Sequence, residues 1–121
     1  MGKTVNVGIV GTQFMGRAHS NAWMDVEKFY DLPARPVMKA ACDNVAENLG
    51  PFCNRFGWQS QETDWKKLVA RDDIDVVDIC TSNAIHMPIA VAAAKAGKHI
   101  ICEKPVAMNA DEAKAMLDAA E

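Results

Sequence analysis

The stretch that most constrains the fold of this chain is the passage from Val5 to Ser20, VNVGIVGTQFMGRAHS. An apolar strand ends at Gly11, and Gly16 opens a segment whose apolar residues recur at helical spacing. A turn of this kind exposes backbone N–H groups, and the N-terminus of the following helix carries about half a positive charge. The passage therefore predicts a strand, a turn and a helix that together bind a phosphate or pyrophosphate.

One residue of this turn departs from the usual glycine pattern. In the dinucleotide-binding pattern G-x-G-x-x-G, the middle glycine lets the backbone approach the pyrophosphate closely. Gln13 occupies that position here, between Gly11 and Gly16. Either its Cβ holds the phosphate slightly further out, or its side-chain amide donates a hydrogen bond that offsets the difference. Turns with two glycines also occur in helix-packing units that bind nothing, so the rest of the chain has to decide.

Short apolar strands alternate with helical segments along the whole chain. The strands are expected over residues 5–10, 36–42, 58–62, 74–80 and 98–102. The helices are expected over 14–27, over 45–56 as two short pieces with Pro51 near the start of the second, over 65–70, over 85–96 and in a last segment that starts after Asn109. This alternation predicts an α/β fold, a doubly wound parallel sheet with helices on both faces. The expected strand order is 3-2-1-4-5.

Two helix starts and one buried face can be assigned in more detail. Asp64 and Asn109 are expected to be N-caps, and Glu112 completes a capping-box pattern with Asn109. The last helix is expected to bury Ala113, Met116, Leu117 and Ala120. Asp78 lies inside the apolar strand 74–80, and the sequence indicates no partner for it.

Composition narrows the classes of partner. The chain has 121 residues, half of them hydrophobic, which is enough for one core. The net charge is −3 without a basic run, so nucleic acid and anionic membranes are not expected partners. No apolar run approaches membrane-spanning length and no secretory signal precedes the first strand, which indicates a cytoplasmic protein.

The cysteines and histidines do not predict a metal site. Cys42, Cys53, Cys80 and Cys102 lack C-x-x-C spacing, so we expect free thiols with structural roles. His19 and His99 are also interpreted as structural residues, because one lies on the packed side of a helix and the other within a strand.

The ligand of a doubly wound sheet lies outside the carboxyl ends of the strands, where the strand order reverses. Asp43 directly follows the second strand, where a carboxylate can accept hydrogen bonds from an adenosine ribose. The alternative is an aspartate of an ordinary surface turn. Asn44 is uncharged, so a 2′-phosphate would meet Asp43 without a basic partner, and we expect NAD rather than NADP.

Two further polar segments follow strands: TSNAIH over residues 81–86 and EKP over 103–105. With GIVGTQFMGRAHS at the start, CD after the second strand, DVVDICTSNAIH at the fourth and GKHIICEKPVAMN at the fifth, the chain resembles the glucose-fructose oxidoreductase and inositol dehydrogenase family, often written Gfo/Idh/MocA. The resemblance covers the whole chain. It implies a Rossmann domain over residues 1–121 that lacks the family's sixth strand and its substrate domain.

The resemblance also implies a function. The chain would be the nucleotide-binding part of an NAD(P)-dependent oxidoreductase that transfers hydride to or from a sugar, polyol or related compound. A non-catalytic nucleotide-binding or sensing module, and a scaffold that binds no nucleotide, are the alternatives. Because a missing sixth strand would leave the fifth strand at an open edge, we expect a homo-oligomer.

Position by position, the resemblance places residues 11–16 at the pyrophosphate and Asp43 at the ribose. Thr81, Asn83 and His86 would line the nicotinamide half of the cofactor, and Ser82 stands where many relatives carry proline. Lys104 would be catalytic, reaching the reacting hydroxyl or carbonyl of the substrate, where an amine can exchange a proton. The full set of implied cofactor-binding residues is Gly11, Thr12, Gln13, Phe14, Met15, Gly16, Asp43, Thr81, Ser82, Asn83, His86, Glu103 and Lys104.

Overall fold

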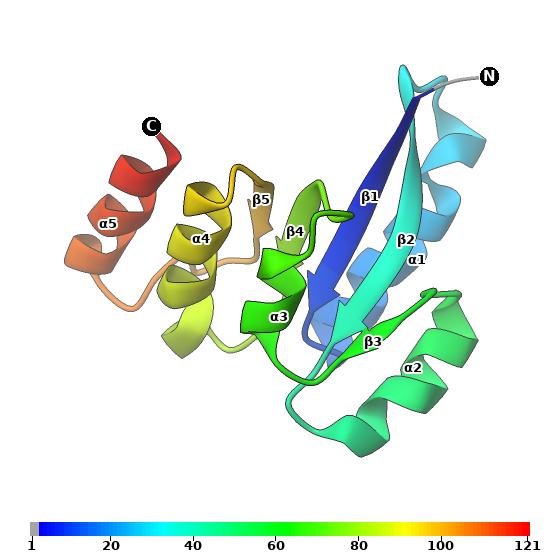
Figure 1. Ribbon diagram of the computed structural model, residues 1–121, viewed down its shortest axis with the longest axis horizontal. Coiled ribbons are helices and arrows are strands. Elements are labelled where there is room, and N and C mark those ends of the chain that lie inside the picture. The colour runs from blue at the N-terminus through cyan, green and yellow to red at the C-terminus, as the bar shows by residue number, and fades with distance from the viewer. Residues whose placement is uncertain (1–2) are drawn as a thin grey trace.

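The computed structural model describes residues 3–121, in which five parallel strands form one sheet in the order β3-β2-β1-β4-β5 (Figure 1). The strands are β1 (Lys3–Val10), β2 (Ala34–Cys42), β3 (Gln61–Glu62), β4 (Val76–Ile79) and β5 (His99–Cys102). The α-helices are α1 (Phe14–Phe29), α2 (Leu49–Phe56), α3 (Trp65–Ala70), α4 (His86–Lys95) and α5 (Ala110–Ala120), and the short 3-10 helices are η1 (Ala46–Asn48) and η2 (Asn83–Ile85). The predicted fold class and strand order are confirmed.

The helices cover the two faces of the sheet in two groups (Figure 1). On one face, α1 and α2 pack on the sheet through Trp23, Leu49 and Phe52, which surround the buried Val7 and Ile9 of β1. On the other face, the core combines side chains of α3, α4 and α5 with those of β1, β2 and β4; its buried members include Leu68, Val77, Ile79, Ile89 and Met116. β4 and the C-terminal parts of β1 and β2 are buried on both faces, and these segments are almost continuously apolar, as central parallel strands are.

Both predicted N-caps are confirmed. The Oδ1 atom of Asp64 accepts a hydrogen bond of 2.9 Å from the backbone N–H of Lys66 at the start of α3. The Oδ1 atom of Asn109 accepts one of 2.9 Å from the N–H of Glu112 at the start of α5. The carboxylate of Glu112 reaches back to the N–H of Met108, which completes the box one residue earlier than expected.

The prediction for the buried face of α5 is wrong at two positions. Met116 is buried and packs on the core, but Leu117 is 58% exposed and Ala120 is exposed as well. The cause is the position of α5, which packs against α4 beyond the end of the sheet, so within residues 3–121 only one side of the helix is covered. Among the described residues β5 pairs only with β4 and forms one edge of the sheet.

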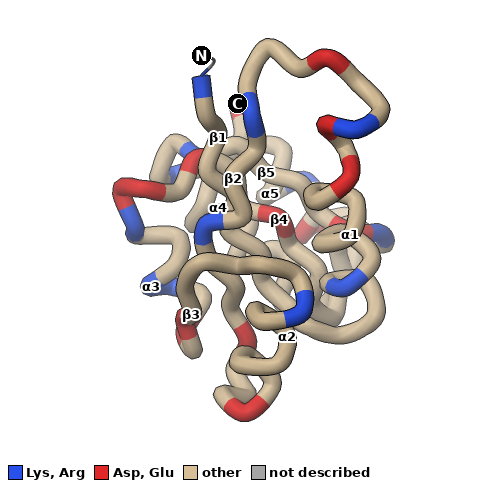
Figure 2. Tube along the Cα trace, turned by 90° about the vertical axis from the view of Figure 1, so that its right-hand side faces the viewer, with Lys and Arg blue, Asp and Glu red and all other residues tan. Residues whose placement is uncertain are grey.

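Charged residues are spread over the molecule without separation by sign. In Figure 2 the blue and red segments alternate along the helices and loops, in agreement with the sequence. Within residues 3–121, none of the helices combines the length and the apolar character that spanning a membrane requires.

Candidate functional site

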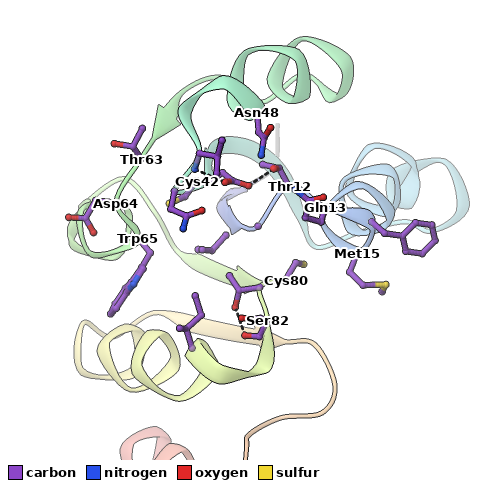
Figure 3. A pocket seen from close by; sticks show the side chains of 18 residues that line it. Thr12, Gln13, Met15, Cys42, Asn48, Thr63, Asp64, Trp65, Cys80 and Ser82 are labelled. Atoms are coloured by element: carbon purple, nitrogen blue, oxygen red, sulfur yellow. Dashed lines mark hydrogen bonds between the residues drawn. The ribbon is translucent and has the colours of Figure 1, made fainter.

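A pocket of ≈ 760 Å³ lies at the carboxyl ends of β1, β2 and β4, on the side of the sheet where the strand order reverses (Figure 3). Predicted site residues form a large part of its wall: Gly11, Thr12, Gln13, Phe14, Met15, Asp43, Thr81 and Ser82. The other lining residues are Val10, Cys42, Asn44, Val45, Asn48, Thr63, Asp64, Trp65, Cys80 and Ile85. The position agrees with the expectation for a doubly wound sheet.

The turn after β1 is held by two close backbone approaches. Gly11 has a φ of +109°, and a Cβ there would lie 2.5 Å from the carbonyl oxygen of Cys80. A Cβ on Gly16 would lie 2.0 Å from the carbonyl oxygen of Gly11. Gln13 between them has a φ of −79°, which suits any residue, and its side chain is exposed at the pocket. Glutamine therefore occupies the middle position without backbone strain.

The start of α1 offers unpaired backbone donors to this pocket. The first helical hydrogen bond runs from the N–H of Arg17 to the carbonyl of Gln13, at 3.0 Å. The N–H groups of Phe14, Met15 and Gly16 precede that bond and so have no intrahelical acceptor. The first turn of α1 carries no acidic side chain that would neutralise its positive end. This end of the pocket is therefore suited to an anion.

The carboxylate of Asp43 is fixed by two donors from the same pocket. Its Oδ2 accepts a hydrogen bond from the hydroxyl of Thr12, and its Oδ1 accepts one of 2.8 Å from the N–H of Val45. Asp43 is 8% exposed, and Thr12 is buried as well. An ionised carboxylate has about four lone-pair sites, so two remain for further donors such as a diol.

Three apolar residues of the wall were not predicted. Val45 and Ile85, both about two-fifths exposed, and the partly buried Trp65 line the pocket from three different segments. Each stands close behind a strand or at a helix start, where sequence reasoning assigned it to secondary structure only. Their common position near the carboxyl ends of the strands is the feature from which their place in the pocket wall could have been predicted.

Several predicted residues lie outside the pocket wall: Gly16, Asn83, His86, Glu103 and Lys104. Gly16 acts through the backbone approach described above. His86 is 1% exposed, with Nδ1 at 3.0 Å from the carbonyl oxygen of Pro105 and Nε2 at 3.0 Å from that of Thr81. The structure thus places His86 behind the pocket wall, where its ring joins the loop after β4 to the loop after β5.

Glu103 and Lys104 follow β5 at the same end of the sheet. The N–H of Glu103 donates to the carbonyl of Ile79 at 3.0 Å, which continues the pairing of β4 with β5. The Oε1 atom of Glu103 accepts a hydrogen bond of 2.9 Å from the backbone N–H of Lys104. That bond and a second one from His19 hold the pKa of Glu103 below its ordinary value. The side chain of Lys104 is exposed.

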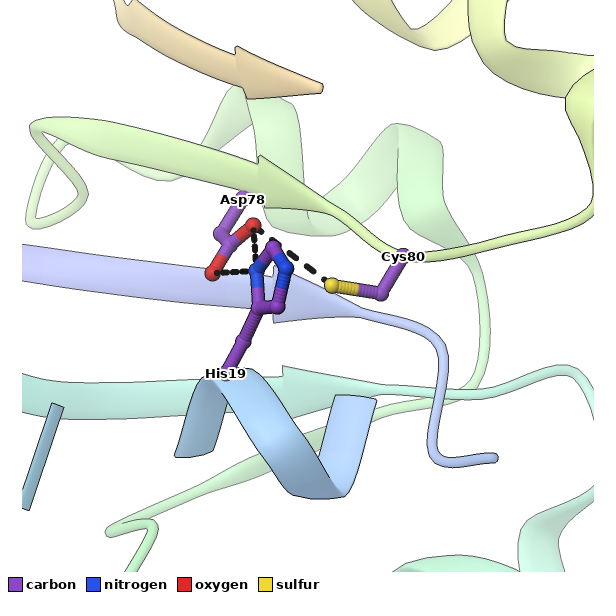
Figure 4. Close-up of side chains that lie close together, drawn as sticks. All are labelled: His19, Asp78 and Cys80. Carbon is purple, nitrogen blue, oxygen red and sulfur yellow. Dashed lines mark hydrogen bonds and ion pairs between the residues drawn. The ribbon is translucent and has the colours of Figure 1, made fainter. Parts of the chain in front are cut away.

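Asp78 and His19 are partners, which the sequence did not reveal. Asp78 is fully buried in β4, and the Nδ1 atom of His19 lies 2.8 Å from its Oδ1 (Figure 4). The indole N–H of Trp23 donates to Oδ2 of Asp78 at 2.9 Å. Nε2 of His19 lies 2.8 Å from Oε2 of Glu103. The interpretation of His19 as a packing residue is therefore incomplete, and an aspartate inside an apolar strand was the signal for a buried donor.

This network changes the proton affinity of His19. Burial lowers the pKa of the imidazole, but Asp78 and then Glu103 outweigh burial and raise the pKa above its ordinary value. Cys80 lies beside the pair, and its thiol donates to Oδ1 of Asp78 at 3.5 Å. Ligand atoms of His19, Asp78 and Cys80 lie within 4.8 Å of one another, a spacing that a metal ion could use. In this structure the three side chains are instead hydrogen-bonded to one another, and the carboxylate of Asp78 also accepts from Trp23.

The sequence of residues 5–121 matches the model of a family described as an oxidoreductase family with an NAD-binding Rossmann fold, GFO_IDH_MocA. Among curated proteins, levoglucosan dehydrogenase from Pseudarthrobacter phenanthrenivorans is 46% identical over 118 residues, which are 97% of this chain and 30% of that protein. Inositol 2-dehydrogenase from Salmonella typhimurium is 29% identical over 117 residues, 96% of this chain and 33% of that protein.

The solved structures agree with the sequence comparison. A levoglucosan dehydrogenase in complex with NADH and L-sorbose superimposes with a TM-score of 0.95 at 45% identity, over 98% of this chain and 32% of that one. The chain therefore spans about a third of the length of the relatives that it matches.

Proposed function

The chain belongs to this oxidoreductase family with the NAD-binding Rossmann fold, and from that premise we propose that its ≈ 760 Å³ pocket binds NAD(H). We propose further that the whole protein transfers hydride between NAD and a sugar, a polyol or a related hydroxyl or carbonyl compound. The observation that carries the proposal is the pocket itself, which combines the unpaired N–H groups at the start of α1 with the fixed carboxylate of Asp43.

One end of that pocket suits the pyrophosphate of an adenosine diphosphate group, and the other end suits its ribose. The N–H groups of Phe14, Met15 and Gly16 can donate to pyrophosphate oxygens at the positive end of α1. Asp43 keeps two lone-pair sites for the ribose hydroxyls, because Thr12 and Val45 already hold the carboxylate in place. A ligand with only one of these features would leave half of the polar wall unused.

The apolar lining supports a flat ring beside the ribose. Val45 and Ile85 present aliphatic surface to the same cavity, and the indole of Trp65 closes it from the start of α3. Adenine offers a flat face of matching character, and pockets of this kind fix orientation with a few polar groups. Thr81 and Ser82 continue the wall toward the loop that carries Glu103 and Lys104.

NAD, when bound, supplies the hydride acceptor or donor. Loss of hydride from a hydroxyl-bearing carbon also requires loss of the hydroxyl proton, so a base is needed. Lys104 is the residue that we assign to this exchange, because its amine is exposed at the carboxyl end of β5. The levoglucosan dehydrogenase structure with NADH and L-sorbose supports a sugar as the substrate class. We also propose a cytoplasmic location and self-association through the open edge of β5.

A titration of the 121-residue protein with NADH tests the cofactor site. We expect saturable binding by calorimetry, with NMR shifts of the backbone amides of residues 13–16 and of Asp43. The amides of α5 serve as the internal control, because that helix does not line the pocket. The absence of binding up to millimolar NADH, or shifts confined to other parts of the chain, would refute the proposal.

A further inference from the structure

We propose that His19, held between Asp78 and Glu103, is a positioning residue that fixes the backbone at Lys104. The importance of this for catalysis rests on the role proposed above for Lys104, whereas the link between the four residues can be measured without cofactor. His19 belongs to α1, Asp78 to β4 and Glu103 to the loop after β5, so the network joins three elements that are distant in sequence.

One end of the network is rigid. Asp78 is fully buried, and its carboxylate accepts hydrogen bonds from Trp23 and Cys80 in addition to the contact with His19. β4 itself is buried along its whole length and pairs with β1 and β5. The imidazole is therefore oriented by an acceptor that cannot move without disturbing the sheet.

The other end depends on the protonation state of His19. Both neighbours of the ring are carboxylates, which accept hydrogen bonds and do not donate them when ionised. The imidazolium donates to both, with 2.8 Å from Nδ1 to Asp78 and 2.8 Å from Nε2 to Glu103. A neutral ring that keeps its proton on Nδ1 would direct the Nε2 lone pair at the carboxylate of Glu103. Deprotonation of His19 would therefore release Glu103.

The carboxylate of Glu103 also holds the backbone of the next residue, Lys104. Its Oε2 is held by His19, and its Oε1 accepts the backbone N–H of Lys104 at 2.9 Å. The two oxygens of the Glu103 carboxylate thus link the imidazole of His19 to the backbone N–H of Lys104. Because that side chain is exposed, its start at the backbone is the part that the protein can hold in place.

The groups that face His19 are known from each element packed against it. β4 contributes Asp78 and Cys80, and the loop after β5 contributes Glu103. Burial lowers the pKa of His19, and the two carboxylates outweigh that effect and raise it. We therefore expect the imidazolium to persist above the pH at which an ordinary histidine loses its proton, about 6.5.

NMR on the cofactor-free 121-residue protein tests the proposal through the resonances of two residues, His19 and Lys104. The ring resonances of His19 should titrate above pH ~6.5, and the backbone amide of Lys104 should shift with the same midpoint. In His19→Gln the amide of Lys104 should lose this titration and exchange with solvent about tenfold faster, as expected for loss of a charge-assisted hydrogen bond. The matched control is His99→Gln, at an exposed position of β5, which should change neither.

A second variant keeps the test decisive if His19→Gln does not fold. Glu103→Gln keeps the shape of the side chain but removes its charge, so the His19 titration should move to lower pH. A Lys104 amide that ignores the His19 titration in the wild type, or a His19 that titrates at or below pH ~6.5, would overturn the proposal. Failure of NADH binding would refute the proposed function but leave this result unaffected.

Discussion

The carbonyl oxygen of Gly11 lies where a side chain of Gly16 would begin, because a Cβ at residue 16 would stand 2.0 Å from it. The end of β1 and the first turn of α1 are therefore in direct backbone contact. This contact aims the N-terminus of α1 at the pocket, and it requires glycine at residue 16 whatever residue occupies position 13.

Gly16→Ala should destabilise the protein and weaken NADH binding. The methyl group cannot be accommodated by moving a flexible side chain, since the obstacle is backbone, and overpacking of this kind typically costs about 1 to 3 kcal/mol. Urea denaturation measures the loss. Gly50→Ala is the matched control, because Gly50 lies in α2 with nothing within 4 Å of a Cβ, and it should be neutral or gain up to about 1 kcal/mol. Equal stability of both variants would contradict this account of the turn.

Asp43→Asn should reduce the preference for NADH over NADPH. The amide oxygen can still accept a hydrogen bond, but the negative charge that would face a 2′-phosphate is gone. A like-charge contact at a partly buried site costs about 1.4 kcal/mol or more, which corresponds to a factor of about ten in an equilibrium constant. We therefore expect the ratio of the two dissociation constants to change about tenfold. Fluorescence titration with both cofactors measures this ratio. Asp118→Asn on α5 changes the net charge equally and should leave the ratio unchanged; tighter NADPH than NADH binding by the wild type would show that Asp43 does not face the ribose.

The stability of the protein should fall as the pH rises above about 6.5. His19 has a raised pKa in the folded state, so its protonated form is favoured by folding. Its contribution is fully present below the unfolded-state pKa and is lost as the pH rises through the folded-state value. Urea unfolding from about pH 6 to about pH 9 measures the decline. His19→Gln should flatten this part of the curve, and a decline that persists in the variant would assign it to another group.

None of the four cysteines should react quickly with a thiol reagent in the native protein. Burial, and then Asp43, raise the pKa of the Cys42 thiol to about 12, and burial, then Glu103, raise that of Cys102 to about 11. Burial also raises the pKa of Cys53 and of Cys80. Since the thiolate is the nucleophile, a disulfide reagent at about pH 8 should react slowly before unfolding and with four thiols after it. A thiol that reacts rapidly in the native protein would contradict this prediction.

The fold could be predicted from the sequence because local signals agreed with each other. The glycines of the first turn, the caps at Asp64 and Asn109 and the apolar strands all indicated one doubly wound sheet. Leu117 was assigned to the core from its helical spacing alone, and it is exposed because the described part of the chain covers α5 on one side only. Periodicity shows that a face is apolar, but not whether another element covers it.

The candidate site was predictable where a residue directly follows a strand. Asp43, Thr81 and Ser82 line the pocket as expected. His86 was placed in the same way, yet both of its ring nitrogens face backbone carbonyls behind the wall. The partnership of His19 with Asp78 spans 59 residues of sequence, and no local pattern encodes a side-chain contact at that distance. Only the arrangement of α1 on the sheet brings the two together.

The last prediction separates binding from turnover. The 121-residue protein should bind NADH but should not reduce NAD in the presence of inositols, aldoses or levoglucosan. Lys104 is exposed to solvent here, whereas hydride transfer needs a substrate held about 3 to 3.5 Å from its acceptor in a site that excludes water. Without such positioning, about 7 to 11 kcal/mol of barrier lowering is lost.

The assay follows NADH absorbance, with NADH affinity measured on the same preparation. The levoglucosan dehydrogenase of Pseudarthrobacter phenanthrenivorans, of which this chain covers 30%, is the positive control with levoglucosan. Lys104→Met should bind NADH as the wild type does, because Lys104 does not line the pocket. Turnover by the purified 121-residue protein that disappears in Lys104→Met would show that residues 1–121 already hold the substrate in place, and the expected separation of binding from turnover would be wrong.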